Sequence, residues 1–400
     1  AGSLMQIVEK RQALKVPPLL RLAFRPLFLL GSVLALLAIP FWVHAWLGAA
    51  GSWQPVGGWL AWHRHELVFG FAGAIIAGFL LTAVQSWTGR PSLSGKPLAV
   101  LVAIWLGARL SWLLGAPLWL LIPLNLLFLL LAALAMARLL WAVRQKKNYP
   151  VVAILLLLLF AEAQCLAGLA LADHEWQRRA VLAAVWLVAA MMTLIGGRVI
   201  PFFIQRGLGR ATAVTPIVWL DWTLLLGAAL VAVLHAAGPA LQPSLLIAPL
   251  FVLLAFGHGV RLWRWFDRGL LAVPLLWSLY LAYAWLVLAC AGMALWHAGV
   301  LLNYSQPLHA LTVGSMAGLI LAMLARVSLG HTGRPLVLPA GMPWAFALLN
   351  AGALARVFLI EAWPQAGLWL AMSCWSLAFA LFLWRYAPML CSTRADGHPG

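Results

Sequence analysis

Two histidines at the same position of a repeated segment are the residues best placed to do chemistry. Residues 65–91 and 309–335 align without a gap, and each segment opens with a histidine, His65 or His309. Neutral imidazole binds iron and copper, and two imidazoles can hold a haem from both faces. The repeat therefore predicts a metal or haem site formed by two related helices. The alternative is that each imidazole only bonds to the backbone at a helix end.

A third histidine, His63, precedes His65 by two residues in WHRHE. On a helix the two side chains point about 200° apart, so they would serve different sites. We take His63 as a candidate catalytic residue and metal ligand, and the alternative is a histidine in an interfacial aromatic belt. The neighbouring carboxylate of Glu66 is suited to orient a metal-bound imidazole.

Three further charged residues fall inside apolar segments. Arg109 and Arg356 have no obvious carboxylate partner in the sequence, and haem propionates would supply one. The alternative is that both snorkel to the membrane interface. Glu162 is a candidate catalytic proton carrier, or else a protonated, hydrogen-bonded group. His331 is a candidate metal ligand that lies about 33 Å from His309 along a helix, too far to share one metal.

Composition places these residues in a membrane. The chain has 400 residues, of which 65% are hydrophobic and 9% are charged, and its mean hydropathy is +0.98. A single soluble core cannot hide so much apolar surface. No cleavable signal peptide is expected. The four cysteines have no metal-ligand spacing and are expected to be free core residues.

We predict an all-α integral membrane protein of about twelve transmembrane helices. Residues 1–24 would form an N-terminal segment, 25–388 the transmembrane domain and 389–400 a tail. The expected spans are 25–47, 63–87, 97–115, 117–143, 150–170, 177–200, 216–236, 243–264, 270–297, 304–328, 343–361 and 366–388.

The repeat extends over residues 65–115 and 309–361, which relates the second span to the tenth. An offset of eight helices suits three pseudo-repeats of four helices. The sixth span would be the remaining equivalent: its GGRVIPFF sequence resembles part of the tenth span, but it has no opening histidine.

Basic residues predict the orientation. With the N-terminus inside, only five of the 26 Lys and Arg residues fall on the outer side. The remaining 21 are in cytoplasmic loops and termini, as the positive-inside rule requires. Both termini are therefore expected to be cytoplasmic, with His63, His65 and His309 toward the periplasmic face. The net charge of +17 is then mostly a topology signal, and no nucleic-acid partner is expected.

Several segments resemble the NnrS family, haem- and copper-containing membrane proteins of the bacterial nitric-oxide response. The segments that carry the resemblance are FRPLFLL (24–30), WHRHELVFGFAGAIIAGFLLTAV (62–84), WTGRPSLSGKPLA (87–99), GGRVIPFF (196–203), PLLWSLYLAYAW (274–285) and HALTVGSMAGLILAMLARVSLGHTGRPL (309–336). The resemblance implies that His63, His65, His309 and His331 are metal or haem residues. Tyr280 stands where the family often has a histidine.

The architecture also resembles, more distantly, that of haem–copper oxidases and nitric oxide reductases. Together the resemblances imply haem b, with copper as a second metal, in the bacterial inner membrane. The expected function is binding of nitric oxide and its reduction to nitrous oxide, with electrons from a quinol or a small redox protein. Two alternatives stay open: a non-catalytic protein that binds nitric oxide or relieves metal nitrosyls, and a transporter.

Overall fold

The computed structural model describes residues 10–48 and 51–400, so the first nine residues of the predicted N-terminal segment lie outside it. The described residues form helices and connecting turns, without a β-strand. Eleven of their helices are long and apolar enough to cross a membrane. The prediction of an all-helical, multi-pass membrane protein is therefore confirmed.

The eighth predicted span, 243–264, corresponds to α10 (Ala248–Trp265), which is a helix of 18 residues but is not among those eleven. Its second half contains His258, Arg261 and Arg264, and these polar side chains lower its hydropathy. The other predicted spans lie within a few residues of observed ones at most of their ends. The largest difference is α8, which continues seven residues past its predicted end, through Pro201, to Gly207.

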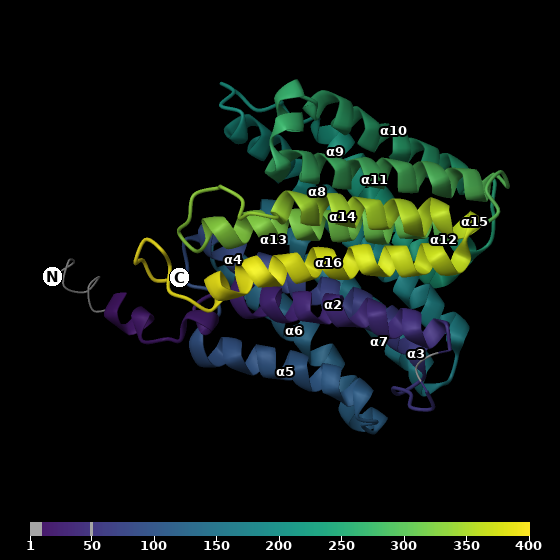
Figure 1. Ribbon diagram of the computed structural model, residues 1–400, viewed down its shortest axis with the longest axis horizontal. Helices are drawn as coiled ribbons and strands as arrows, with labels where there is room; N and C mark the ends of the chain where they lie inside the picture. Colours follow the sequence, from purple (N-terminus) through teal and green to yellow (C-terminus); the bar gives the residue numbers. More distant parts are fainter. Residues whose placement is uncertain (1–9, 49–50) are drawn as a thin grey trace. The chain divides into compact units, whose positions relative to one another are not determined.

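The chain divides into two compact units. Unit 1 comprises the residues up to Ala172 together with Leu324–Ala340 and Phe379–Gly400. Within it, α5, α6 and α7 pack in succession, and α2 packs on α4 (Figure 1). Its main helices are α2 (Phe24–Trp46), α3 (Trp59–His65), η2 (Glu66–Ala72), α4 (Gly73–Thr88), α5 (Gly95–Leu113), α6 (Leu118–Ala142) and α7 (Tyr149–Ala170).

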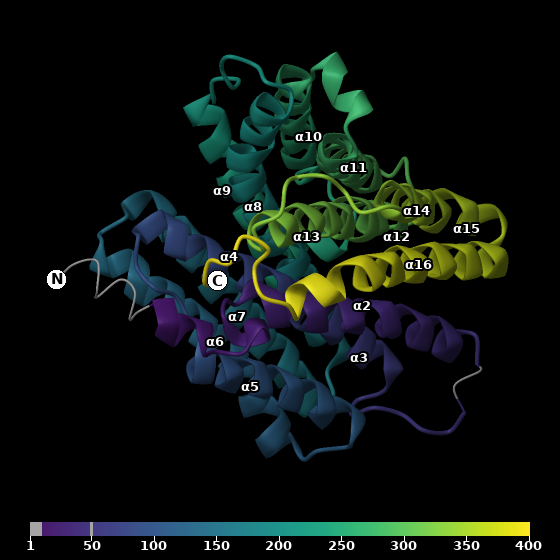
Figure 2. The same cartoon turned by 60° about the vertical axis from the view of Figure 1, so that its left-hand side comes forward.

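Unit 2 comprises Asp173–Met323 and Gly341–Ala378. Within it, α8 packs on α9, and α10 packs on α11 (Figure 2). Its main helices are α8 (His174–Gly207), α9 (Val218–Ala237), α10, α11 (Pro274–His297), α12 (Ser305–His309), η6 (Ala310–Ala317), α14 (Met342–Leu354), η7 (Ala355–Leu359) and α15 (Ile360–Ala362). Two helices, α13 (Gly318–Gly330) and α16 (Pro364–Leu390), contain residues of both units.

The two repeated segments share an unusual backbone. In each, a short α-helix ends at the histidine, a π-helix follows, and an α-helix completes the span. The π-helices are η2, of seven residues, and η6, of eight. Such helices are rare and frequently occur at functional sites. The sixth span, α8, is α-helical throughout, so the local structure relates only the second and tenth spans, and the threefold repeat stays a prediction.

Glycines at equivalent positions let neighbours approach the two π-helices. A Cβ on Gly70 would lie 3.0 Å from a guanidinium nitrogen of Arg109, and a Cβ on Gly314 would lie 2.4 Å from the indole of Trp285. The repeat also ends alike in both copies. Gly89 and Gly333, of the two TGRP sequences, adopt φ values of 68° and 71°, a conformation that glycine reaches without strain.

Candidate functional site

A buried network of charged side chains surrounds His65 in unit 1. The His65 side chain is fully buried, and its ring packs against Phe69 and Trp112, with centroids 5.1 Å and 4.8 Å away. Its Nδ1 lies 2.8 Å from Oε1 of Glu66, and its Nε2 lies 2.9 Å from Oε1 of Glu162. One imidazole therefore connects a carboxylate of η2 with a carboxylate of α7.

Arg109 of α5 completes the network. Its Nε lies 2.6 Å from Oε2 of Glu66, so the carboxylate partner that the sequence analysis did not find is Glu66. Its Nη2 donates to Oδ1 of Asn125 at 2.8 Å, and its guanidinium lies over the ring of Trp105. The Trp105 indole in turn donates to the carbonyl oxygen of Gly70 in the π-helix, at 3.0 Å.

Counting protons shows what this network can do. Ionised carboxylates only accept hydrogen bonds, and a neutral imidazole has a single N–H to donate. Two hydrogen bonds between His65 and two carboxylates therefore require one more proton, on His65 or on one of the carboxylates. In either case the four groups sum to zero charge, which lowers the cost of burying them at membrane depth. The network thus holds one proton that the three ionised or neutral groups around Arg109 share.

His309, the equivalent histidine in unit 2, has different neighbours. Its Nδ1 lies 2.7 Å from the carbonyl oxygen of Ser305 in its own helix, to which it donates. The lone pair of the neutral ring is then on Nε2. The hydroxyl of the same Ser305 accepts from Nη2 of Arg356 at 3.2 Å. Ser305 thereby brings a predicted haem ligand and a predicted propionate partner together within unit 2.

The remaining predicted site residues lie apart from these two groups. His63 stacks on Trp42, with centroids 4.4 Å apart and the planes 11° from parallel. His65 instead contacts the carboxylates of Glu66 and Glu162, so the two histidines have different neighbours, as expected. His331 follows the end of α13, with its ring 5.6 Å from that of Phe24. Burial lowers the pKa of the His331 imidazole, and the charge of Arg394 lowers it further.

Sequence reasoning missed two buried networks in unit 2. In the first, Arg261 donates to Tyr283 at 2.9 Å and to Asp221 at 2.8 Å, while the Tyr283 hydroxyl donates to Nδ1 of His258 at 2.7 Å. The sequence did place His258 and Arg261 three residues apart on one predicted span and Tyr283 on the next span, which could have indicated this network. Tyr280, where the family often has histidine, instead donates to the carbonyl oxygen of Leu262 at 2.9 Å.

In the second network, the Tyr304 hydroxyl donates to Nε2 of His235 at 2.9 Å, and Nδ1 of His235 donates to the carbonyl oxygen of Val231. Burial raises the pKa of the Tyr304 phenol, so it stays an O–H donor. Tyr304 directly precedes α12, so this contact fixes the start of the helix that carries His309.

We next consider groups of side chains that could bind a metal ion together. Within residues 10–48 and 51–400, no group of three or more His, Cys, Asp or Glu residues is arranged to hold a metal ion. The four cysteines are free, as predicted, and Cys391 is exposed while the other three are buried.

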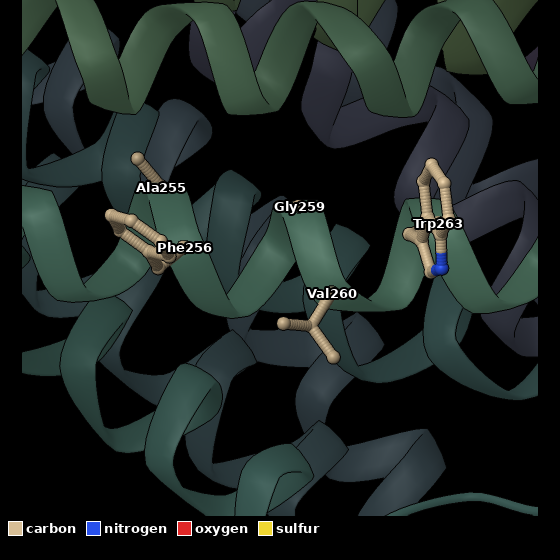
Figure 3. Close-up of a pocket in the computed structure, with 5 residues that line it drawn as sticks. All are labelled: Ala255, Phe256, Gly259, Val260 and Trp263. Carbon is tan, nitrogen blue, oxygen red and sulfur yellow. The ribbon is translucent and has the colours of Figure 1, made fainter.

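A pocket on α10 contains no chemistry-bearing side chain (Figure 3). Its lining comes from α10 alone and consists of Ala255, Phe256, Gly259, Val260 and Trp263. Phe256 and Trp263 are strongly exposed, as lipid-facing residues of a membrane protein are. We therefore place the candidate site at the repeated histidines.

The fold and these buried charges define a multi-pass membrane protein with ionisable groups inside its spans. The chain belongs to the NnrS family, because the sequence model of that family, described as NnrS protein, matches residues 18–394. Membership fits a membrane protein of the nitric-oxide response. No curated protein matches the chain.

Proposed function

We propose that this protein binds nitric oxide at a haem and reduces it to nitrous oxide in defence against nitrosative stress. The observation that carries the reductive part is the single imidazole of His65 between Glu66 and Glu162. Reduction joins two NO molecules, two electrons and two protons into N2O and water, whereas binding alone consumes no proton. A buried, charge-neutral proton store is therefore useful to a reductase and unnecessary to a simple NO-binding protein.

His309 fits the role of haem ligand. Metal-bound histidines usually donate their other ring N–H to a carbonyl or carboxylate, and Nδ1 of His309 does so to Ser305. Arg356, on the same serine, would hold a propionate. The haem would supply the iron that binds NO and passes electrons to it. For His65 to bind the haem iron as well, its Nε2 would have to leave Glu162.

The side chains of the network have separate tasks in this proposal. Arg109 keeps Glu66 ionised, and Glu66 fixes the orientation of the His65 ring. His65 and Glu162 share the transferable proton, which leaves from Glu162 and is replaced from water. His63 remains a candidate ligand for copper, the second metal that the proposal includes.

The proposed setting is the bacterial inner membrane with both termini in the cytoplasm, since the basic residues follow the positive-inside rule. The His65 and His309 ends of the repeated spans would then face the periplasm. Proposed partners are nitric oxide, membrane lipid, and a quinol or a small redox protein as electron donor.

The test is anaerobic consumption of NO by the purified, haem-loaded protein with excess reductant, with N2O as the measured product. Wild type should consume many equivalents per haem. Glu162→Gln should bind NO but turn over roughly 100-fold more slowly, because positioned proton transfer contributes about that much. Cys165→Ser, on the same helix, is the matched control and should turn over like wild type. Consumption that stops at one equivalent would leave only the non-catalytic alternative, and a colourless protein would favour the transporter.

A further inference from the structure

Arginines gather at the end of unit 1 that is opposite to His65 along the second span. Arg21 and Arg25 stand one turn apart at the start of α2, Arg334 belongs to the TGRP turn after α13, and Arg394 lies in the tail. Arg21, Arg334 and Arg394 all lie near enough to Arg25 to repel its charge. We call these four residues the arginine cluster. Phe24, beside them, donates its backbone N–H to Thr82 near the end of α4, which fixes their place along the span.

Carboxylates do not balance this charge. Among the described residues, the structure gives a carboxylate partner only to Arg394, which binds Asp396 through two contacts of 2.9 Å and 2.7 Å. Arg21, Arg25 and Arg334 thus have no acidic side chain as an ion-pair partner among the described residues. This is the reverse of the His65 network, where Arg109 has Glu66.

Backbone carbonyls meet part of the hydrogen-bonding demand. Arg25 is fully buried, and Arg21 is 8% exposed. Three acceptors of Arg25 are the carbonyl oxygens of Met389, Leu390 and Ser392, and the fourth is an oxygen of Gly400, the last residue of the sequence. The acceptors of Arg21 are those of Leu14 and Val16. Carbonyl oxygens are neutral, so they satisfy N–H groups without cancelling charge.

Each of these three arginines also has a buried nitrogen for which residues 10–48 and 51–400 provide no acceptor. These atoms are Nη1 of Arg21, Nε of Arg25 and Nη1 of Arg334. Buried guanidinium N–H groups almost always have a partner, so three such atoms in one like-charged cluster call for an acceptor that is also negative. The first turn of α2 adds the positive end of a helix dipole.

We propose that the arginine cluster binds a phosphate group, either of an anionic lipid headgroup or of free phosphate. A phosphate offers several acceptor oxygens and a full negative charge, and guanidinium groups match its geometry. The cluster lies where membrane-crossing helices begin and end, which is the level of lipid headgroups. This inference is independent of the proposed nitric-oxide chemistry.

The repeat offers a matched control for testing it. Arg90 is the equivalent of Arg334 in the first TGRP sequence, but it is exposed and outside the cluster. The variants are therefore Arg21→Gln and Arg334→Gln, with Arg90→Gln as the control. Arg25 is left unchanged, because its removal would release the tail carbonyls. The measurement is the melting temperature of the delipidated full chain in neutral detergent, titrated with phosphatidylglycerol, phosphatidylcholine or inorganic phosphate.

We expect phosphatidylglycerol to raise the melting temperature of wild type and of Arg90→Gln. Each cluster variant should bind it about tenfold more weakly, the equivalent of one charge-assisted hydrogen bond. Stabilisation by inorganic phosphate as well would support a site for free phosphate, and stabilisation by the anionic lipid alone would support a headgroup site. Without any anion, Arg334→Gln should melt no lower than wild type, because it removes repulsion from Arg25.

Three results would overturn the proposal. One is the absence of stabilisation by both phosphatidylglycerol and phosphate. Another is equal binding by the cluster variants and Arg90→Gln. The third is that Arg334→Gln melts lower than wild type by the same amount with and without anion, since that would indicate a purely structural role.

Discussion

The two copies of the repeat share the same backbone structure, but their histidines have different hydrogen-bond partners. Both histidines end a short α-helix, and both precede a π-helix. Yet His65 is bonded through both nitrogens to carboxylates, whereas His309 is held through Nδ1 by Ser305 of its own helix. The position after His65 is Glu66, and the position after His309 is Ala310. A duplicated helix can therefore keep its geometry while neighbouring side chains assign different tasks to the same imidazole.

The largest effect should come from removing the carboxylate that distinguishes the copies. Glu66→Ala gives the first segment the residue of the second, and it leaves Arg109 as a buried charge without its ion-pair partner. We expect a loss of about 3–5 kcal/mol in the free energy of unfolding, measured by denaturation in detergent. Glu66→Gln, which keeps an acceptor, should lose less. An unfolding free energy of Glu66→Ala equal to that of wild type would show that the ion pair contributes nothing.

The glycines of the π-helices should come next. Gly314→Ala would place a Cβ 2.4 Å from the rigid indole of Trp285, whereas Gly70→Ala would place one at the longer distance of 3.0 Å from Arg109 and from Leu34. Both should destabilise by about 1–3 kcal/mol, with Gly314→Ala the more severe. Gly330→Ala is the control, because nothing lies within 4 Å of its added Cβ. The reverse order of the two melting temperatures would contradict the packing described here.

The smallest expected effect is on the pH dependence of stability. It comes from His331, which is the equivalent of Trp87 at the end of the second copy of the repeat. Burial and Arg394 lower the pKa of His331 below its usual value of about 6.5, so the unfolded chain binds a proton first as the pH falls. The stability from this group is complete above about pH 6.5 and declines below it. His331→Phe should therefore flatten the dependence of melting temperature on pH between about 7 and 5. Parallel profiles for wild type and variant would contradict this.

Hydropathy alone predicted where the helices lie, because a span must be apolar over its whole length. At α10 it also predicted a helix, but polar side chains such as those of His258 and Arg261 leave this helix out of the eleven apolar enough to cross a membrane. The π-helices η2 and η6 had no signal in the hydropathy pattern, because a π-helix and an α-helix of the same span are equally apolar. Duplicated motifs revealed that His65 and His309 correspond.

The partners of His65 were harder to predict. Glu66 follows His65 directly and was expected to orient an imidazole, whereas Arg109 and Glu162 come from two other helices and no local spacing relates them to His65. What the sequence did contain was each charge, alone at membrane depth, where an unpaired charge is expensive. Each buried charge is therefore expected to have a partner, but the sequence does not show which residue that partner is. Asn125, a neutral residue that joins Arg109 to Trp112, had no comparable signal.

The divergence of the two histidines is tested most directly by the visible absorption spectrum of the dithionite-reduced protein, compared between His65→Ala and His309→Ala. The account predicts that His309→Ala loses its bound haem, and that His65→Ala keeps haem while its NO turnover falls. Loss of haem in both variants would instead favour one haem held between the two repeats, and retention of haem by His309→Ala would contradict the assignment of His309.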